Sequence, residues 1–269
     1  MRTFHDRVAV VTGAGGGIGR ATALALAGRG CVLALVDVNS ETLGETQRLV
    51  EGRSAKATTH VADVSDEHRM AELADEVVAR HGTCHILVNN AGVLSAGRFA
   101  DDRMEDIHWI VGINVFGVLH GCHSFLPALR EADEAHIVNV SSMAAFVGLP
   151  QNAVYSLTKG AVRAFTEALR AELVGTSIGV SVLFPGATNT NIMRGSRGTH
   201  AERLNHLADK GIAKFFSSSP DAAARKIVRA IEHDTPRVLL GPDARLLDLS
   251  ARLAPGRAGL VGRALNLVT

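Results

Sequence analysis

The sequence predicts an α/β fold, a single-domain Rossmann-type doubly wound parallel sheet of about seven strands with helices on both faces. Short β-branched runs alternate with helical stretches, the order expected of parallel strands joined by right-handed crossovers. Hydrophobic residues make up 46% of the chain but aromatics only 4%, so Ala, Val, Leu and Ile must build the core. Because no repeat or linker divides the 269 residues, we expect one domain over residues 1–269.

The predicted elements alternate regularly up to residue 184. Strands are expected at residues 7–12, 31–36, 56–62, 84–88, 136–140, 178–184 and 237–240, where short apolar runs end at turn residues. Helices are expected at residues 18–29, 40–52, 65–81, 103–129 and 221–232, and another carries Tyr155 and ends near residue 174. The core would span about residues 5–240.

Two segments depart from this alternation. Residues 189–219 are polar, contain glycines and are long for a connection, which is typical of a substrate lid. Residues 243–269 form an amphipathic C-terminal extension that combines leucines with arginines. We expect it to pack on the protein or on a partner subunit. A membrane surface is the less favoured alternative, because Pro255, Gly256 and Gly259 interrupt a long interfacial helix.

Charge, cysteine content and hydropathy narrow the class of protein. The net charge is +1 and no basic block is present, so no nucleic-acid partner is expected. Three cysteines without C-x-x-C spacing indicate reduced thiols. We find no signal peptide and no uninterrupted apolar stretch as long as a membrane span, so we expect a cytoplasmic protein. The histidines do not form an H-E-x-x-H motif, and no metal site is predicted.

A glycine cluster lies between the first predicted strand and the first helix. Glycines at this point permit a tight turn and let backbone N–H groups approach a pyrophosphate, which the positive end of the helix dipole also favours. Such a cluster alone is weak evidence, because turns use glycine for steric reasons, but its place between a strand and a helix strengthens it. The predicted cofactor-binding residues here are Gly13, Gly15, Gly16, Gly17, Ile18 and Gly19.

Asp37 ends the second predicted strand, about twenty residues after the glycine cluster. A carboxylate there can hydrogen-bond the adenosine ribose hydroxyls and repel a 2′-phosphate. A solvated loop aspartate is the alternative. No Arg or Lys occupies Gly16, Val38 or Asn39, where a 2′-phosphate would need a partner, so NAD is preferred to NADP.

Tyr155 is the only tyrosine, and Lys159 follows it four residues later. In a helix the two side chains share one face, and a fixed positive charge favours the phenolate. We therefore expect Lys159 to lower the pKa of Tyr155 towards the range of a general acid/base. By itself the pair is weak, because an exposed helix face carries such residues by chance.

Further motifs turn the pair into a site. Residues 5–240 resemble the short-chain dehydrogenase/reductase family, with motifs in family order and at family-like spacing. These motifs are Thr12-Gly-x-x-x-Gly17-Ile-Gly19, Asp63-Val64, Asn89-Asn-Ala-Gly92, Asn114, Ser142, Tyr155-x-x-x-Lys159 and Pro185-Gly186. The resemblance implies reversible hydride transfer between NAD and a secondary alcohol or ketone. It also implies a homo-oligomer, a tetramer or a dimer, formed through the two long helices.

The resemblance assigns roles to four catalytic residues. Tyr155 would exchange a proton with the substrate oxygen, and Ser142 would polarise that oxygen. Lys159 would lower the phenol pKa and bind the nicotinamide ribose. Asn114 would kink its helix and hold a water that links Lys159 to solvent. A buried Asn bonded to backbone is the alternative for Asn114, because an unsatisfied buried amide is costly.

The resemblance also implies cofactor and substrate contacts. Further cofactor contacts would be Asp63, Val64, Asn90, Ala91, Gly92, Tyr155, Lys159, Pro185, Gly186, Thr188 and Thr190. The substrate pocket would be bounded by Ser95, Ala96, Ala144, Phe146, Val147, Gln151, Ile192 and Met193. Mostly apolar walls favour a hydrophobic ketone or alcohol, but the sequence does not name the substrate. A catalytically silent NAD(H)-binding sensor or scaffold remains the alternative function.

Overall fold

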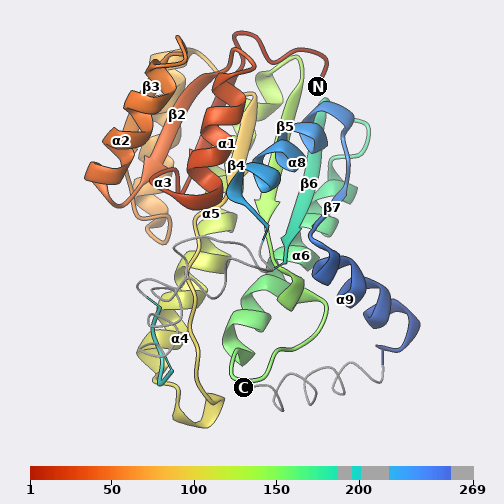
Figure 1. Ribbon diagram of the computed structural model, residues 1–269. Coiled ribbons are helices and arrows are strands. Elements are labelled where there is room, and N and C mark those ends of the chain that lie inside the picture. Colours follow the sequence, from red (N-terminus) through yellow and green to blue (C-terminus); the bar gives the residue numbers. More distant parts are fainter. Residues whose placement is uncertain (187–195, 201–217, 256–269) are drawn as a thin grey trace.

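The computed structural model describes residues 1–186, 196–200 and 218–255. Its centre is one sheet of seven parallel strands in the order β3-β2-β1-β4-β5-β6-β7, with helices on both faces (Figure 1), and the predicted fold class is confirmed. The strands are β1 Val8–Thr12, β2 Val32–Asp37, β3 Ala57–Val61, β4 Ile86–Asn89, β5 Ala135–Val140, β6 Ile178–Pro185 and β7 Arg237–Leu240.

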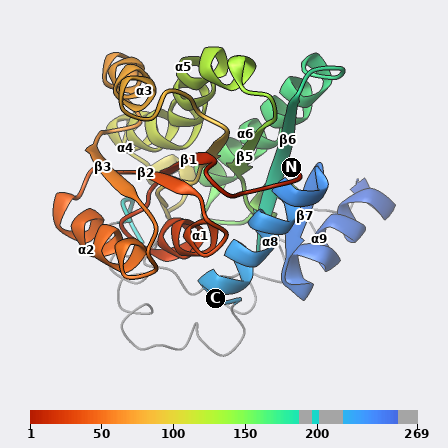
Figure 2. The same cartoon turned by 90° about the horizontal axis from the view of Figure 1, so that it is seen from above.

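Two layers of helices cover the sheet. The long helices are α1 Gly17–Ala27, α2 Ser40–Glu51, α3 Glu67–His81, α4 Met104–Val111, α5 Gly117–Glu131, α6 Ala153–Glu172, α8 Pro220–His233 and α9 Pro242–Leu253. Figure 2 shows α1, α2 and α8 on one face and α3, α5 and α6 on the other. Along β1, Ala9 and Val11 join the first core, whereas Val8 and Val10 join the second. Side-chain alternation in buried parallel strands therefore produces two cores.

The order of the strands determines where a ligand site is expected. The chain runs outwards from β1 through β2 to β3, then returns to the other side of β1 with β4. Parallel pairing, for example of Val10 with Leu87, brings the carboxyl ends of β1 and β4 to one edge of the sheet. In doubly wound sheets, ligands bind in the crevice at this reversal point. The glycine cluster and residues 90–92 both follow strands that end there.

The helix predicted at residues 103–129 is interrupted. α4 ends at Val111, a π-helical turn covers Gly112–Phe116, and α5 continues to Glu131. Together they form one helical stretch, Met104–Glu131, that is long and apolar enough for a membrane span by length and composition only. It was the only such stretch found among the residues described, and its α5 part packs against α3, β4 and β5. A core helix passes the same test of length and composition.

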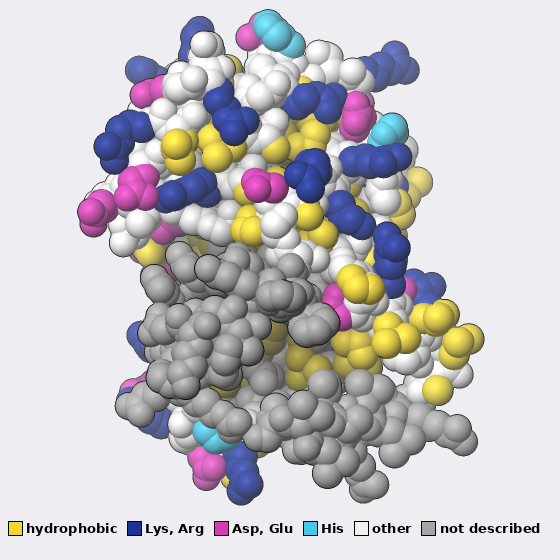
Figure 3. Space-filling model, viewed as in Figure 1, with side chains coloured by type: hydrophobic (Ala, Val, Ile, Leu, Met, Phe, Trp, Pro, Cys, Tyr) yellow, Lys and Arg dark blue, Asp and Glu magenta, His cyan; other side chains and the backbone are white. Residues whose placement is uncertain are grey.

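The C-terminal extension begins with α9. An ion pair between Arg237 and Asp248, with 2.9 Å between Nη2 and Oδ1, attaches the helix to β7. Leu246, Leu249 and Leu253 are nevertheless exposed, and Figure 3 shows uncovered hydrophobic side chains over α9. The expected packing of the extension is thus observed for one face of α9 only. Residues 256–269 lie outside the described part of the chain.

Candidate active site

The glycine cluster forms a tight turn between β1 and α1. Gly13 and Gly17 have φ angles of +65° and +51°, which side chains rarely adopt. A Cβ atom at Gly13 or Gly19 would lie 2.8 or 2.6 Å from Nδ2 of Asn90, so both positions require glycine. At Gly16, by contrast, a Cβ atom would meet nothing within 4 Å, so this side of the turn is open.

The amino end of α1 differs from those of three other helices. Asn39, Asp66 and Ser219 cap α2, α3 and α8 through side-chain oxygens, but α1 begins after Gly16 with no side-chain cap. The first N–H groups of a helix need an acceptor, and an anion satisfies them well. An open glycine turn at an uncapped helix end therefore fits the pyrophosphate of a dinucleotide.

Asp37 lies against this turn. One of its oxygens accepts a hydrogen bond from the Gly15 N–H at 2.8 Å and the other from the Asn39 N–H at 3.1 Å. The nearby Arg20 guanidinium is engaged by Glu45, with 2.8 Å between Nη2 and Oε2, and by the Thr42 carbonyl at 3.1 Å. The Asp37 carboxylate, predicted to bind the ribose, thus lies beside the turn. Arg20 is already engaged by Glu45 and Thr42.

The predicted adenine-side residues surround the same turn. The Asn90 side chain donates to the Thr12 carbonyl at 2.9 Å, and the Asn90 and Ala91 N–H groups each donate to Thr12 Oγ1 at 3.0 Å. These bonds join the end of β4 to the end of β1. Asp63 is exposed and accepts from Ser65 in the turn before α3, while Val64 is buried.

Ser142 and Tyr155 meet beyond the carboxyl end of β5. Ser142 is buried and precedes the short 3-10 helix Met143–Ala145, where its Oγ accepts from the Ala144 N–H at 3.2 Å. It also forms a hydrogen bond with the phenol of Tyr155, near the start of α6. The neighbouring Ser141 instead donates to the Lys159 carbonyl at 2.7 Å, because side chains alternate in direction at the end of a strand.

Lys159 is a buried cation without a carboxylate partner among the residues described. Its Nζ donates to the Val140 carbonyl at 3.0 Å and lies 5.9 Å from the centre of the Tyr155 ring. Burial lowers the pKa of Lys159 to about 8. A Cβ atom at Gly92 would lie 3.4 Å from this Nζ, so glycine leaves room for the lysine beside the end of β4.

The pKa of Tyr155 departs from our prediction. Burial raises the pKa of the phenol, and the hydrogen bond from Ser142 opposes this only in part. Lys159, whose Nζ lies 5.9 Å from the ring centre and donates to the Val140 carbonyl, does not reverse the direction of this shift. The predicted net lowering of the Tyr155 pKa is therefore wrong for the protein groups alone.

Asn114 lies inside the π-helical turn and is fully buried. Its Oδ1 accepts from the Val93 N–H at 2.8 Å, and its Nδ2 donates to the Val93 carbonyl at 2.9 Å and to Thr158 Oγ1 at 3.2 Å. The wide turn lets the amide reach the backbone of the loop after β4. The alternative of a backbone-bonded Asn is thus observed, and the Thr158 contact also places Asn114 beside Lys159.

Several predicted contacts lie elsewhere. The Phe146 ring packs against Phe184, with 4.4 Å between the ring centres, and the Arg163 and Arg237 guanidinium groups lie 5.4 and 5.7 Å from its centre. These contacts direct Phe146 towards β6 and β7 and do not support its predicted place in the pocket. Thr188, Thr190, Ile192 and Met193 lie outside the described residues.

Other pocket and nicotinamide-side predictions can be located. Ser95, Ala96, Ala144 and Val147 are buried, Pro185 ends β6, and Gly186 donates to the Leu240 carbonyl at 2.9 Å. No sequence pattern singled out His200, whose Nδ1 lies 2.8 Å from Oε1 of Gln151. Within the described ranges, no group of three or more His, Cys, Asp or Glu side chains forms a metal site.

Comparison with known proteins identifies the class. A family model described as short chain dehydrogenase matches residues 7–201. SadH of Mycobacterium tuberculosis, which carries the name of an oxidoreductase, is 35% identical over 255 residues, or 94% of this chain and 92% of that protein. The chain belongs to the short-chain dehydrogenase/reductase family of oxidoreductases.

Solved structures give the same result. A short-chain dehydrogenase/reductase from Burkholderia phymatum in complex with NAD is 29% identical, with a TM-score of 0.87 over 97% of this chain and 96% of that one. An alcohol dehydrogenase from Thermococcus sibiricus complexed with 5-hydroxy-NADP is 26% identical, with a TM-score of 0.75 over 88% and 96% of the two chains. The family therefore includes structural neighbours with either type of dinucleotide.

Proposed function

We propose that this protein is an NAD(H)-dependent oxidoreductase that transfers a hydride between nicotinamide and a secondary alcohol or ketone. The observation that carries the proposal is the arrangement of Ser142, Tyr155, Lys159 and Asn114 at the edge of the sheet that also holds the open glycine turn. The same edge therefore offers a dinucleotide cradle and a group able to move a proton.

The contacts of Asp37 and Arg20 favour NAD over NADP. The Asp37 carboxylate lies against the glycine turn, where it would meet the adenosine ribose and repel a 2′-phosphate. Arg20, a cation beside the turn, is already bonded to Glu45 and the Thr42 carbonyl. A 2′-phosphate would have to compete with both contacts, whereas two ribose hydroxyls would need only the carboxylate.

The side chains suggest how the proton moves. Bound dinucleotide would supply or accept the hydride. The hydrogen-bonded hydroxyls of Ser142 and Tyr155 would hold the substrate oxygen between them, and the phenol would give it a proton in reduction and remove one in oxidation. The raised pKa of Tyr155 keeps the phenol protonated in the protein alone, so proton removal requires a further positive charge near it.

The test is reduced-nicotinamide absorbance with NAD and a panel of secondary alcohols. We expect Tyr155→Phe to lower kcat/KM by about 10²- to 10⁴-fold while NADH binding is retained, because only the proton donor is lost. Ser142→Ala should also be strongly impaired, and Ser141→Ala, whose hydroxyl faces the other way, should stay within a few-fold of wild type. Full activity in Tyr155→Phe would refute the role of this residue. NADH binding without turnover across a broad panel would favour the sensor alternative.

A further inference from the structure

Residues 196–200 form a short segment attached to the loop that follows β4. Arg197 pairs with Ser95 in a parallel bridge, in which the Ala96 N–H donates to the Arg197 carbonyl at 3.0 Å and the Arg197 N–H to the Leu94 carbonyl at 3.2 Å. The His200 N–H then donates to the Ala96 carbonyl at 3.0 Å. Figure 1 shows this segment in teal, separate from the strands of the sheet. It lies against two of the predicted pocket residues.

Close packing fixes this segment. Gly198 has a φ of +98°, and a Cβ atom there would lie 3.1 Å from the Ala96 carbonyl carbon. On the other side, the Arg197 guanidinium lies 4.3 Å from the centre of the Trp109 ring and 3.7 Å from Asp106 of α4. These contacts hold the segment between the loop and the helix, so the position of His200 is set by its neighbours.

His200 also contacts the loop that leads to the proposed acid/base. Its Nδ1 lies 2.8 Å from Oε1 of Gln151, which can only accept, so Nδ1 carries the hydrogen. Nε2 is then a bare acceptor, and it has no hydrogen-bond partner among the residues described. A half-buried imidazole with one nitrogen fixed and the other available is suited to bind an O–H donor.

Gln151 is itself held in an unusual conformation. Its φ is +60°, in the left-handed region that non-glycine residues rarely adopt, and its carbonyl accepts from the Gly97 N–H at 2.9 Å. Three residues separate it from Tyr155, and α6 begins at Ala153 between them. The imidazole that Gln151 binds therefore lies beside the loop that leads into the helix of Tyr155.

A second polar group lies on the same segment. Ser196 is 8% exposed, and its hydroxyl has no hydrogen-bond partner among the residues described. Leaving a buried hydroxyl unpaired is costly, so an external partner would be stabilising. Ser95, which pairs with Arg197 in the bridge, is buried on the same loop.

We propose that His200, oriented by Gln151, is a specificity-determining residue that accepts a hydrogen bond from a second hydroxyl of the substrate. The preferred substrates are then diols or hydroxyketones rather than simple hydrophobic alcohols. This inference rests on the proposed function, because it assumes turnover at Tyr155. It assigns His200 a contact with the part of the substrate that does not react.

The test compares kcat/KM for matched pairs of alcohols, such as cyclohexanol with 1,2-cyclohexanediol and 2-butanol with 2,3-butanediol. We expect wild type to favour the dihydroxy members by about tenfold or more, because a site with a buried polar group rejects a substrate that leaves it unpaired. His200→Ala should lose this preference through a higher KM for the diols. Thr199→Ala, in the same segment, should retain it.

His200→Asn separates substrate contact from a merely structural role. Its amide nitrogen can replace Nδ1 as the donor to Gln151 but leaves nothing at the position of Nε2, so we expect the preference to be lost as in His200→Ala. Restoration of the preference in His200→Asn, or equal use of both members by wild type, would overturn the inference while leaving the proposed function intact. Absence of turnover with every pair, in protein that binds NADH, would overturn both.

Discussion

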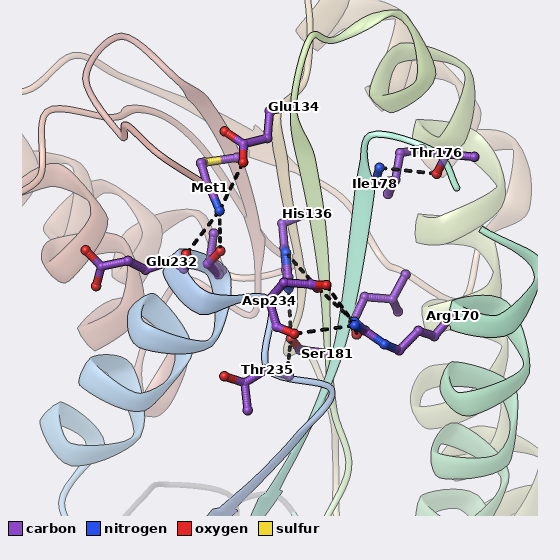
Figure 4. A network of polar contacts seen from close by, with 12 residues as sticks. Met1, Glu134, His136, Arg170, Thr176, Ile178, Ser181, Glu232, Asp234 and Thr235 are labelled. Carbon is purple, nitrogen blue, oxygen red and sulfur yellow. Dashed lines mark hydrogen bonds and ion pairs between the residues drawn. The ribbon is translucent and has the colours of Figure 1, made fainter. Parts of the chain in front are cut away.

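Buried ionisable groups lie at both ends of β5, but their surroundings are opposite. At the amino end, His136 Nε2 donates to Ser181 Oγ at 2.8 Å, and Ser181 donates to the Thr235 carbonyl at 2.7 Å (Figure 4). Beside them, Arg170 binds both carboxylate oxygens of Asp234, at 2.8 and 2.7 Å. Burial lowers the pKa of His136 to about 4, so the ring is neutral near pH 7.

Beyond the carboxyl end, Lys159 is buried with only a carbonyl as its hydrogen-bond partner among the residues described. No carboxylate balances its charge in this part of the structure, unlike Arg170 at the other end. A buried unpaired cation costs stability, and such groups concentrate at functional sites. The comparison indicates that the amino end of β5 is built for stability and the carboxyl end for chemistry.

The largest effect is expected from Lys159→Met, which should lower catalytic activity without lowering stability. We expect kcat/KM to fall by about 10²- to 10⁴-fold, the range of an acid/base machinery losing a necessary partner. The free energy of unfolding at pH 7 should equal or exceed that of wild type, because an apolar chain of similar length replaces a buried cation. Kinetics and urea unfolding measure the two effects. A clear loss of stability in Lys159→Met would contradict the contrast between the two ends of β5.

Low pH should destabilise the protein mainly through His136, at the amino end of β5. Because the folded pKa of His136 is lowered from 6.5 to about 4, the unfolded chain binds more protons between these values, and stability falls as the pH falls from 6.5 towards 4. In His136→Gln, whose amide can still donate to Ser181, this loss should be smaller by on the order of 1–3 kcal/mol. Thermal unfolding across this range tests it, with the exposed His5→Gln as control. Identical pH dependence in wild type and His136→Gln would contradict the effect of burial.

The smallest effect is expected from Asp234→Asn. The variant weakens the ion pair to Arg170, but the two side chains are 51% and 31% exposed, so solvent screens the charges. Asn also tolerates the left-handed conformation at this position, where φ is 48°. We expect a loss of about 0.5–1 kcal/mol that shrinks with added salt, and kcat/KM within twofold of wild type. A large loss of activity would show that the two ends are coupled.

Local patterns were enough to predict the order of strands and helices and the motifs at their ends. The strand predicted at residues 7–12 is β1 Val8–Thr12, and Ser142 and Tyr155 come together as the family spacing implies. These features depend on neighbours along the chain. The alternation of short apolar runs and helical stretches was sufficient to predict the elements, whereas the family resemblance implied that Ser142 and Tyr155 meet.

The features that were missed depend on distant contacts. The resemblance implied a kink at Asn114 but not its form, a π-helical turn whose amide exchanges hydrogen bonds with Val93, 21 residues away. The environment of His200 depends on Gln151, 49 residues away. The direction of the Tyr155 pKa shift depends on burial, which only the assembled protein determines. Phe146 was expected to bound the substrate pocket, but aromatic and cationic neighbours on β6, β7 and α6 decide where its ring packs.

The wide turn at residues 112–116 has a consequence for how this chain tolerates insertions and deletions. A π turn holds one residue more than an α turn, and each residue rotates a helix by about 100°. The wide turn absorbs this extra residue, so α4 and α5 keep the facing that an uninterrupted helix one residue shorter would give them. Loss of a single residue there would allow a regular helix but would remove the wide turn in which the Asn114 amide binds Val93.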